Sequence, residues 1–187
     1  MIEIITTEIP NLLIIQPAVY KDYRGCFFEP YNEKRYNEKI KGYSFVQDSE
    51  ASSNQNVIRG LHFQLPPFDQ TKLVRCIMGK ILDVVVDIRK GSPTFAKHLK
   101  TILSGENKKQ LLIPKGFAHG YKVLSKRAIF FYKVDNFYSK ECDYGILYND
   151  SNLNIDWEIP KEKIIISERD ETLPLFKDAI NPFTYKS

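Results

Sequence analysis

Short apolar runs, rich in aromatic and β-branched residues and broken at close intervals by turn residues, fill most of the chain between residues 11 and 166. Such runs predict β-strands. We expect strands at 12–15, 26–31, 45–47, 57–64, 71–77, 80–89, 95–104, 110–113, 118–124 and 128–135. Many short strands with regular turns favour an antiparallel sandwich or barrel, and the lack of alternating strands and helices argues against a parallel sheet.

The segments between and after these runs predict a few further elements. Met78-Gly79 separates two of the predicted strands and indicates a hairpin between them. The charged segment 32–40 has the pattern of a short surface helix. The tail at 170–187 is rich in turn residues, and we expect a short helix within it at 175–179.

The composition fits a single domain that spans 1–187, because 43% of the residues are hydrophobic and 13% are aromatic. The 27 Lys and Arg against 23 Asp and Glu give a net charge of +4 without a clustered basic face. We therefore expect no nucleic-acid partner, although cations remain for a small anionic ligand. The apolar stretches are too short to cross a membrane and the start lacks the blocks of a signal peptide, so we expect a cytoplasmic protein.

The cysteines and glycines limit the chemistry further. Cys26, Cys76 and Cys142 are widely spaced and form no C-x-x-C pair, so we expect reduced thiols that serve as small packing residues. Neither G-x-x-x-x-G-K-[ST] nor G-x-G-x-x-G occurs in the chain. Any phosphate group must therefore be held by side chains.

Two of the three histidines, His62 and His119, stand beside or near glycines, whereas His98 lies in a polar stretch and is expected at the surface. The glycines would let a backbone or a ligand come close to these imidazoles. Lys72 and Arg59 are near them in the sequence. This pattern favours a functional site over two buried structural histidines.

Strand alternation gives a geometric expectation for this site. The even-numbered residues of 58–64 share one face of their strand, and those of 128–134 share one face of theirs. If both faces line the interior of a barrel, His62 and Tyr132 point at each other across a cavity, and a barrel of about eight strands holds one small ligand. Arg59 would then face outward unless a bulge at Gly60 turns it, which the sequence leaves open.

Several blocks of the chain match the motifs of one known family, in order, over roughly residues 10–175. The blocks are DYRGCFFE at 22–29, RGLHFQ at 59–64, QTKLVR at 70–75, DVVVDIRKGSPTF at 83–95, IPKGFAHG at 113–120, ND at 149–150, IDW at 155–157 and SERD at 167–170. On these blocks the chain resembles the dTDP-4-dehydrorhamnose 3,5-epimerase family. The resemblance implies an all-β fold, a jelly-roll or double-stranded β-helix barrel of the cupin type with a few short surface helices.

The resemblance also implies an activity and its catalytic residues. The family inverts carbons of a 4-keto-6-deoxyhexose that is linked to a nucleoside diphosphate, and this chemistry needs a base, an acid and a group that stabilises an enolate. His62 matches the base, since a neutral imidazole is well suited to take a proton at neutral pH. Asp170 matches the carboxylate that orients it, and Tyr132 matches the acid on the far side of the sugar ring. Lys72 is suited to the developing enolate oxygen.

The family's motifs further imply residues that bind a nucleotide sugar, with a dTDP-linked substrate favoured. Arginine side chains suit the diphosphate because they make bidentate contacts. The positions carried over are Arg24, Phe27, Glu29, Gln47, Ser49, Arg59, His119, Tyr138, Asp143 and Arg169. The family's N-terminal segment reaches the neighbouring subunit, so we expect a homodimer in which the first 50 residues contribute to the interface and Arg24 and Glu29 act in the partner's site.

Other interpretations of the function remain open at this point. Cupin-type barrels often bind a metal through H-x-H, but His62-Phe63-Gln64 lacks the second histidine, so we expect neither a metal nor another cofactor. Ser49, Ala51, Lys140 and Asp143 depart from the usual pattern on the binding side. One alternative is therefore an epimerase that inverts only one carbon, or acts on another 4-keto nucleotide sugar such as a GDP-linked one. Another is a barrel that binds sugars without catalysis.

Overall fold

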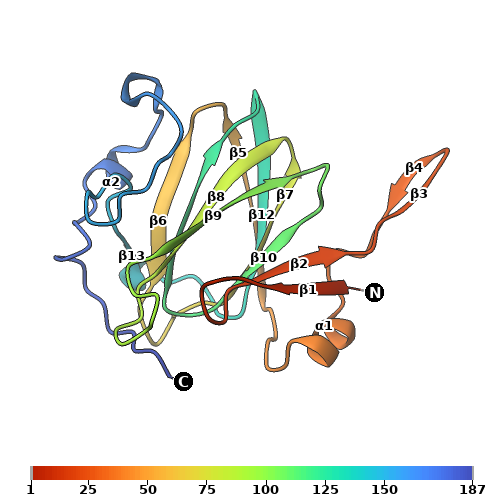
Figure 1. Ribbon diagram of the computed structural model, residues 1–187, viewed down its shortest axis with the longest axis horizontal. Helices are drawn as coiled ribbons and strands as arrows, with labels where there is room; N and C mark the ends of the chain where they lie inside the picture. The colour runs from red at the N-terminus through yellow and green to blue at the C-terminus, as the bar shows by residue number, and fades with distance from the viewer. Residues whose placement is uncertain (1, 187) are drawn as a thin grey trace.

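Two antiparallel sheets pack face to face in the computed structural model, which describes residues 2–186 (Figure 1). One sheet has the strand order β1-β2-β10-β7-β12-β5 and the other has the order β13-β6-β11-β8-β9. The first contains β1 (Ile2–Thr6), β2 (Leu13–Pro17), β5 (Gln47–Asn54), β7 (Lys72–Met78), β10 (Gln110–Ile113) and β12 (Arg127–Val134). The second contains β6 (Ile58–Gln64), β8 (Lys80–Asp87), β9 (His98–Ser104), β11 (Phe117–Val123) and β13 (Asp143–Gly145). The all-β jelly-roll prediction is confirmed.

The main core lies between the sheets, where alternate residues of facing strands meet. Val74 of β7 and Phe130 of β12 come from one sheet, and Val85 of β8 and Tyr121 of β11 come from the other. The neighbours Val84 and Val86 in β8 point the other way into a second apolar cluster, so this strand is buried on both faces. A strand that is covered on both faces has a nearly continuous run of apolar residues in its sequence. Residues 81–86 form such a run, interrupted only by Asp83.

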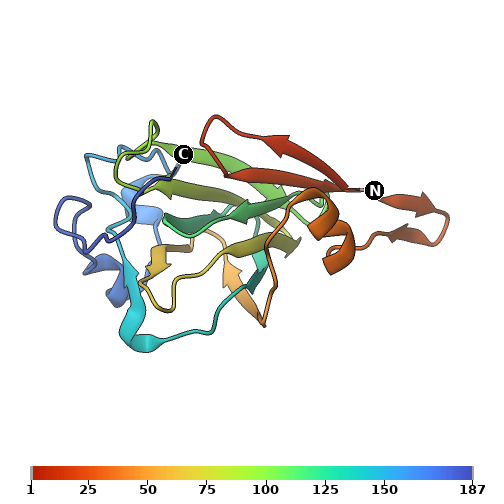
Figure 2. The same cartoon turned by 90° about the horizontal axis from the view of Figure 1, so that it is seen from below.

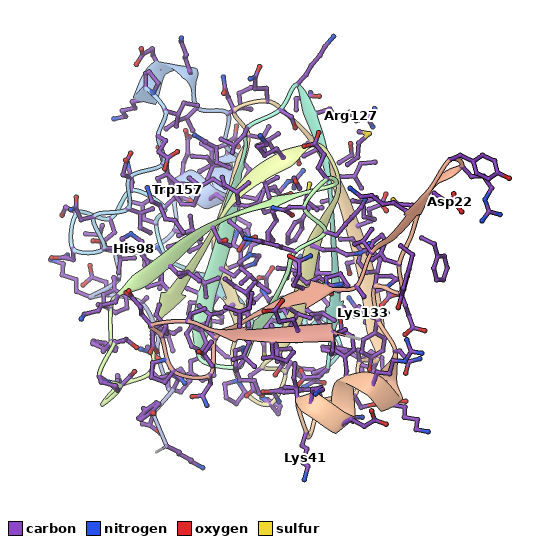
Figure 3. All side chains as sticks on the ribbon, turned by 45° about the vertical axis from the view of Figure 1, so that its right-hand side comes forward. Asp22, Lys41, His98, Arg127, Lys133 and Trp157 are labelled. Atoms are coloured by element: carbon purple, nitrogen blue, oxygen red, sulfur yellow. The ribbon has the colours of Figure 1, made fainter. Side chains whose placement is uncertain are left out.

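The outer faces of the sheets are covered by segments outside the barrel. The C-terminal stretch 146–183 lies over the second sheet, with Trp157 packed in its apolar cluster on the left of Figure 3. Helix α1 (Glu33–Lys39) lies against the first sheet, where its Tyr36 is buried. Asn32 caps this helix by accepting a hydrogen bond from the Arg35 N–H. The predicted helix at 32–40 is confirmed.

A two-stranded hairpin projects from the body of the molecule. It consists of β3 (Tyr20–Asp22) and β4 (Gly25–Phe27), and both views show it extending beyond the sheets (Figures 1 and 2). Asp22 lies near its tip, as Figure 3 shows. Tyr23 is 97% exposed and Phe27 is 71% exposed. Large apolar side chains displayed on a protruding arm are typical of a surface that another molecule covers.

The hairpin predicted at Met78-Gly79 is wrong. Strand β7 pairs with β10 and β12, whereas β8 pairs with β9 and β11, so the turn carries the chain from one sheet to the other. Gly79 has a φ of +80°, and an added Cβ would lie 2.2 Å from the Arg127 carbonyl oxygen. A tight glycine turn between two apolar strands has the same sequence pattern in a hairpin and in a crossover between packed sheets.

Three smaller expectations also need correction. The short helix predicted at 175–179 is absent from the described residues, where that stretch forms turns, and the helix of the tail is α2 (Glu168–Glu171), capped by Ser167. The strand predicted at 45–47 runs instead through the polar β5, whose outward side chains face solvent. Cys26 is exposed on the hairpin, so it is not a packing residue. The remaining short elements are 3₁₀ turns at Lys140–Cys142 and Lys161–Lys163.

No helix among residues 2–186 has the length and apolar character that crossing a membrane requires.

Candidate active site

A cavity of about 170 Å³ lies between the two sheets. Its walls come from β5, β7 and β12 on one side and from β6 and β11 on the other. The lining residues are Ala51, Arg59, His62, Lys72, His119, Gly120, Tyr121, Phe130 and Tyr132. Five of the site residues predicted from the sequence thus lie together, although they come from four separate strands. They are Arg59, His62, Lys72, His119 and Tyr132.

A β-bulge in β6 aims two of these side chains into the cavity. His62 pairs with His119 and Arg59 pairs with Tyr121, so β6 has one residue more than β11 between these pairs. Arg59 and His62 consequently face the same side. The expectation that even-numbered residues of 58–64 share a face is therefore wrong, because Ile58 points into the outer apolar cluster. The bulge at Gly60, which the sequence left open, is present.

Glycine is required at the bulge for two reasons. Gly60 has a φ of +116°, which side chains other than glycine rarely adopt. An added Cβ would also lie 2.6 Å from the Cα of Gly120 and 2.7 Å from the carbonyl oxygen of His119. The close approach of β6 and β11 at this point therefore depends on the glycine-rich sequence of both strands.

The His62 imidazole is held from behind by Asp170. Its Nε2 lies 2.7 Å from Oδ1 of Asp170, while Oδ2 accepts a hydrogen bond of 3.1 Å from the Gly60 N–H. Burial alone would raise the pKa of Asp170, but the hydrogen bonds from His62 and Gly60 and the nearby Arg169 hold it below its usual value. An ionised Asp170 fixes the ring orientation and stabilises a positive charge on His62. The second ring nitrogen is then free to act as a base.

His119 has a buried carboxylate of its own. Its Nε2 lies 3.0 Å from each carboxylate oxygen of Asp83, and Asp83 is completely buried. Because the imidazole lines the cavity, its orientation toward any ligand is set by this contact. Asp83 was not nominated from the sequence, although its place in the apolar run 81–86 marks it as a charged residue within a core strand.

Lys72 is a partly buried cation in the wall of the cavity. Burial lowers its pKa to about 8, against the opposing influence of Asp143 and Asp83. Its ammonium group is therefore charged at neutral pH but close to its titration point. A partly buried charge acts more strongly on a nearby oxyanion than an exposed one, because water screens it less.

Tyr132 lies on the sheet that faces His62. It belongs to β12, where it pairs in register with Ser49 of β5 and Val74 of β7. Its ring is 5.6 Å from that of Phe130. The phenol and the imidazole thus line one cavity from opposite sheets, which is the condition under which strand alternation let them face each other.

A second group of nominated residues lies beside the cavity, between the edge strands β5 and β13. The Gln47 side chain donates to Ser49 Oγ at 3.2 Å and accepts from the Tyr138 N–H at 3.1 Å. Asp143 accepts a hydrogen bond of 3.1 Å from the Tyr138 hydroxyl and forms an ion pair of 2.9 Å with Arg169. Tyr138 is 56% exposed, so its ring is open to a ligand. This set of five residues is referred to as the rim cluster.

Three of the predicted site residues lie away from both the cavity and the rim cluster of their own chain. Arg24 and Phe27 belong to the projecting hairpin, where Arg24 pairs with Asp22 at 2.6 Å. Glu29 lies just beyond the hairpin and forms an ion pair of 2.9 Å with Arg35. If these side chains act in catalysis, they do so in another copy of the chain or after a rearrangement.

Sequence reasoning missed several residues that shape the cavity. Phe130 and Tyr121 are two residues from Tyr132 and His119 on the same strand faces, so alternation could have identified them. Ser53 follows from Ser49 in the same way once β5 is recognised as a strand, and so does the position in the cavity wall of Ala51, which the sequence marked only as a departure from the family pattern. In residues 2–186, no group of three or more His, Cys, Asp and Glu side chains is arranged to hold a metal ion.

The arrangement suits the movement of protons on a small anionic molecule. A carboxylate-oriented imidazole and a phenol face one space, and Arg59 and Lys72 give it positive charge. Fold and site together define a jelly-roll protein whose cavity carries the side chains that acid–base catalysis needs.

Comparison with known proteins makes the assignment specific. The family model for dTDP-4-dehydrorhamnose 3,5-epimerase matches residues 6–178, and the chain belongs to this family. It is similar to the dTDP-4-dehydrorhamnose 3,5-epimerase of Shigella flexneri, with 50% identity over 94% of this chain and 97% of the relative. As a member of this family, the protein is an isomerase.

Solved structures agree with this conclusion. A dTDP-4-dehydrorhamnose 3,5-epimerase from Elizabethkingia anophelis superimposes with a TM-score of 0.90 at 47% identity, covering 95% of this chain and 97% of that one. A dTDP-6-deoxy-D-glucose-3,5-epimerase from Legionella pneumophila, solved in complex with dTDP-4-keto-L-rhamnose, has a TM-score of 0.94 at 43% identity and covers 100% of both chains.

Proposed function

We propose that the protein converts dTDP-4-dehydro-6-deoxy-D-glucose to dTDP-4-dehydro-L-rhamnose by inverting C3 and C5. Family membership supports the reaction. The observation that carries the proposal is the placement of His62 and Tyr132 on opposite sheets around one cavity. Inversion requires a proton to leave one face of the sugar and another to arrive on the opposite face, and two acid–base groups on opposite walls meet that requirement.

In the proposed mechanism, His62 removes the proton from a carbon next to the C4 ketone. The electrons of the C–H bond form a carbon–carbon double bond, and those of the carbonyl move onto its oxygen to give an enolate. Asp170 stabilises the resulting imidazolium at 2.7 Å. Lys72 stabilises the enolate oxygen, a charge that is present mainly after proton removal. Tyr132 then donates its proton to the same carbon from the opposite face, and exchange with solvent resets both groups.

The remaining cations bind the nucleotide portion of the substrate in this proposal. Arg59 and His119 face the cavity and Arg169 stands in the rim cluster, so each can meet a phosphate or a sugar hydroxyl. Gln47 and Tyr138 are placed together at the rim, where the aromatic ring can stack against a base. The departures at Ser49 and Asp143 fall in the rim cluster and the one at Ala51 lies in the cavity wall, which is why the nucleotide must be tested directly.

We further propose a homodimer in which the projecting hairpin completes the partner's site. The exposed Tyr23 and Phe27 and the position of Arg24 outside its own cavity support this assignment. Arg24, Phe27 and Glu29 would then contact substrate in the other subunit. A cytoplasmic location also remains a proposal, and the three free thiols are compatible with a reducing compartment.

Incubation of the protein with dTDP-4-dehydro-6-deoxy-D-glucose in deuterated water tests the proposed function. Proton NMR of the recovered sugar should show deuterium at both C3 and C5 and the L-rhamno configuration in the product. Deuterium at one carbon only would replace the proposal with a single-site epimerase. Binding without any exchange would indicate a sugar-binding barrel instead.

A further inference from the structure

Tyr121 occupies the end of the cavity that is farthest from the rim cluster. Strands β5 and β6 are joined through residues 55–57, and Ser53 and Arg59 stand close to this connection. The Tyr121 ring stacks on Phe130 with ring centres 4.5 Å apart and an angle of 28°. Only 4% of Tyr121 is exposed, yet it lines the cavity. Neither the sequence motifs nor the proposed chemistry gives this phenol a role.

A short chain of polar contacts joins Tyr121 to Arg59. The Nε–H of Arg59 donates to Ser53 Oγ at 3.0 Å, and Ser53 Oγ lies 3.4 Å from the Tyr121 hydroxyl. Ser53 is 6% exposed, and its two hydrogen-bond partners are these two protein side chains. Among the described residues, the two terminal nitrogens of the Arg59 guanidinium make no hydrogen bond. The guanidinium is therefore held at its inner nitrogen, while its outer nitrogens remain available to a ligand.

The contact with Ser53 also has a defined direction. Ser53 Oγ already accepts from Arg59, so its single proton is free to go to the Tyr121 oxygen. Burial raises the pKa of Tyr121, and this effect outweighs the opposing influence of Ser53 and Arg59. The phenol therefore stays neutral through the working pH range, and its oxygen remains a partner for Ser53.

We propose that Tyr121 is a positioning residue that, through Ser53, holds the Arg59 guanidinium in the orientation that receives the anionic part of the substrate. An arginine side chain has several rotatable bonds, and fixing it before the ligand arrives lowers the entropy cost of binding. The bidentate geometry of a guanidinium toward phosphate or paired oxygens also depends on its orientation. Because Arg59 carries no reacting proton, the role concerns substrate binding and not the chemical step. This inference rests on the proposed function.

The experiment compares steady-state kinetics of Tyr121→Phe, Ser53→Ala and the double variant with dTDP-4-dehydro-6-deoxy-D-glucose. Loss of one neutral hydrogen bond in the chain should raise KM about fivefold while kcat stays within about twofold of wild type. The double variant should resemble the single variants, since all of them break the same chain. Tyr148→Phe is the matched control: this buried tyrosine packs in the outer apolar cluster, and its KM should be unchanged.

Three results would overturn the inference. An unchanged KM in Tyr121→Phe would mean that Arg59 does not depend on it. A fall in kcat at constant KM would assign the phenol to the chemistry with Tyr132, and additive effects in the double variant would separate Tyr121 from Ser53. If Tyr121→Phe does not fold, Ser53→Ala alone carries the test. If wild type turns over no dTDP-linked ketosugar, the proposed function fails, and calorimetric binding of dTDP to the same variants still measures the positioning of Arg59.

Discussion

His62 and Asp170 lie with Nε2 and Oδ1 only 2.7 Å apart, although 108 residues separate them in the chain. The carboxylate is carried by α2, whose Ser167 cap accepts a hydrogen bond from the Asp170 N–H at 3.2 Å. Its other oxygen accepts from the Gly60 N–H at the bulge of β6. One carboxylate thus links the short helix of the tail to the strand that carries the base.

Replacement of the Asp170 carboxylate should lower the rate of proton removal by His62 but leave substrate binding largely unchanged. In Asp170→Asn the amide keeps the size of the side chain but removes the charge that stabilises the imidazolium. We expect kcat to fall by about 100-fold, within the range that acid–base groups contribute, and dTDP binding to change little. Asp150→Asn is the control, because this buried aspartate accepts hydrogen bonds from Asn152 and Phe176 outside the cavity. Equal losses of kcat in the two variants would show that the effect is structural.

The titration of Lys72 should appear in the pH profile. With a pKa lowered to about 8, its charged form dominates below that pH and is lost above it. If the charge stabilises the enolate, kcat/KM should fall about tenfold per pH unit above 8, because this ratio reports groups of the free enzyme. In Lys72→Arg the guanidinium remains charged, so activity is reduced by the altered geometry but the alkaline limb near pH 8 disappears. A wild-type profile that stays flat to pH 10 would contradict this role.

The bulge of β6 should be sensitive to a single methyl group. Gly60→Ala places a Cβ 2.6 Å from the Gly120 Cα at a φ of +116°. We expect a loss of about 3 kcal/mol in the free energy of unfolding, from overpacking and backbone strain together. Gly42→Ala is the matched control, with a φ of +93° but nothing within 4 Å of the added atom, and should cost about 1 kcal/mol. Denaturant unfolding that gives equal losses would remove the steric part of the argument.

Mixed dimers can show whether the hairpin acts in the partner's site. Neither Arg24→Ala nor His62→Ala should have appreciable activity alone. If Arg24 serves the other subunit, random mixing after unfolding and refolding restores one intact site in each mixed dimer. Half of the dimers are mixed, so about a quarter of wild-type activity should return. No recovery, with mixed dimers demonstrated by tagged subunits, would place Arg24 in the site of its own chain.

Strand alternation gave one geometric expectation for the site, and the family motifs supplied most of its other residues. It allowed His62 and Tyr132 to face one cavity on the condition that both strand faces line the interior, and the structure meets this condition for the two residues. It failed at Arg59, since a bulge shifts the alternation by one residue and glycine only permits a bulge without requiring one. It also failed to recognise β5, whose outward residues are charged or polar and whose inward residues are small.

Contacts between distant segments were beyond the reach of local patterns. The His119–Asp83 contact depends on the register of β11 against β8, which the sequence does not fix. At Gly79 the chain passes from one sheet to the other because β7 and β8 pair with different strands. The same turn sequence also fits a hairpin, so the sequence does not distinguish the two. The family motifs supplied Asp170 as the partner of His62, because nothing in a turn-rich tail points to a strand so far away in sequence.

The most direct test of the account follows deuterium into the substrate in the presence of the His62→Ala variant. If His62 removes the carbon-bound proton, as we propose, this variant should incorporate no deuterium at C3 or C5 while still binding dTDP with nearly wild-type affinity. Tyr132→Phe, run beside it, should keep some exchange but form little inverted product, since only the opposite-face donor is lost. Exchange by His62→Ala at the wild-type rate would show that another group is the base, and the account would fail.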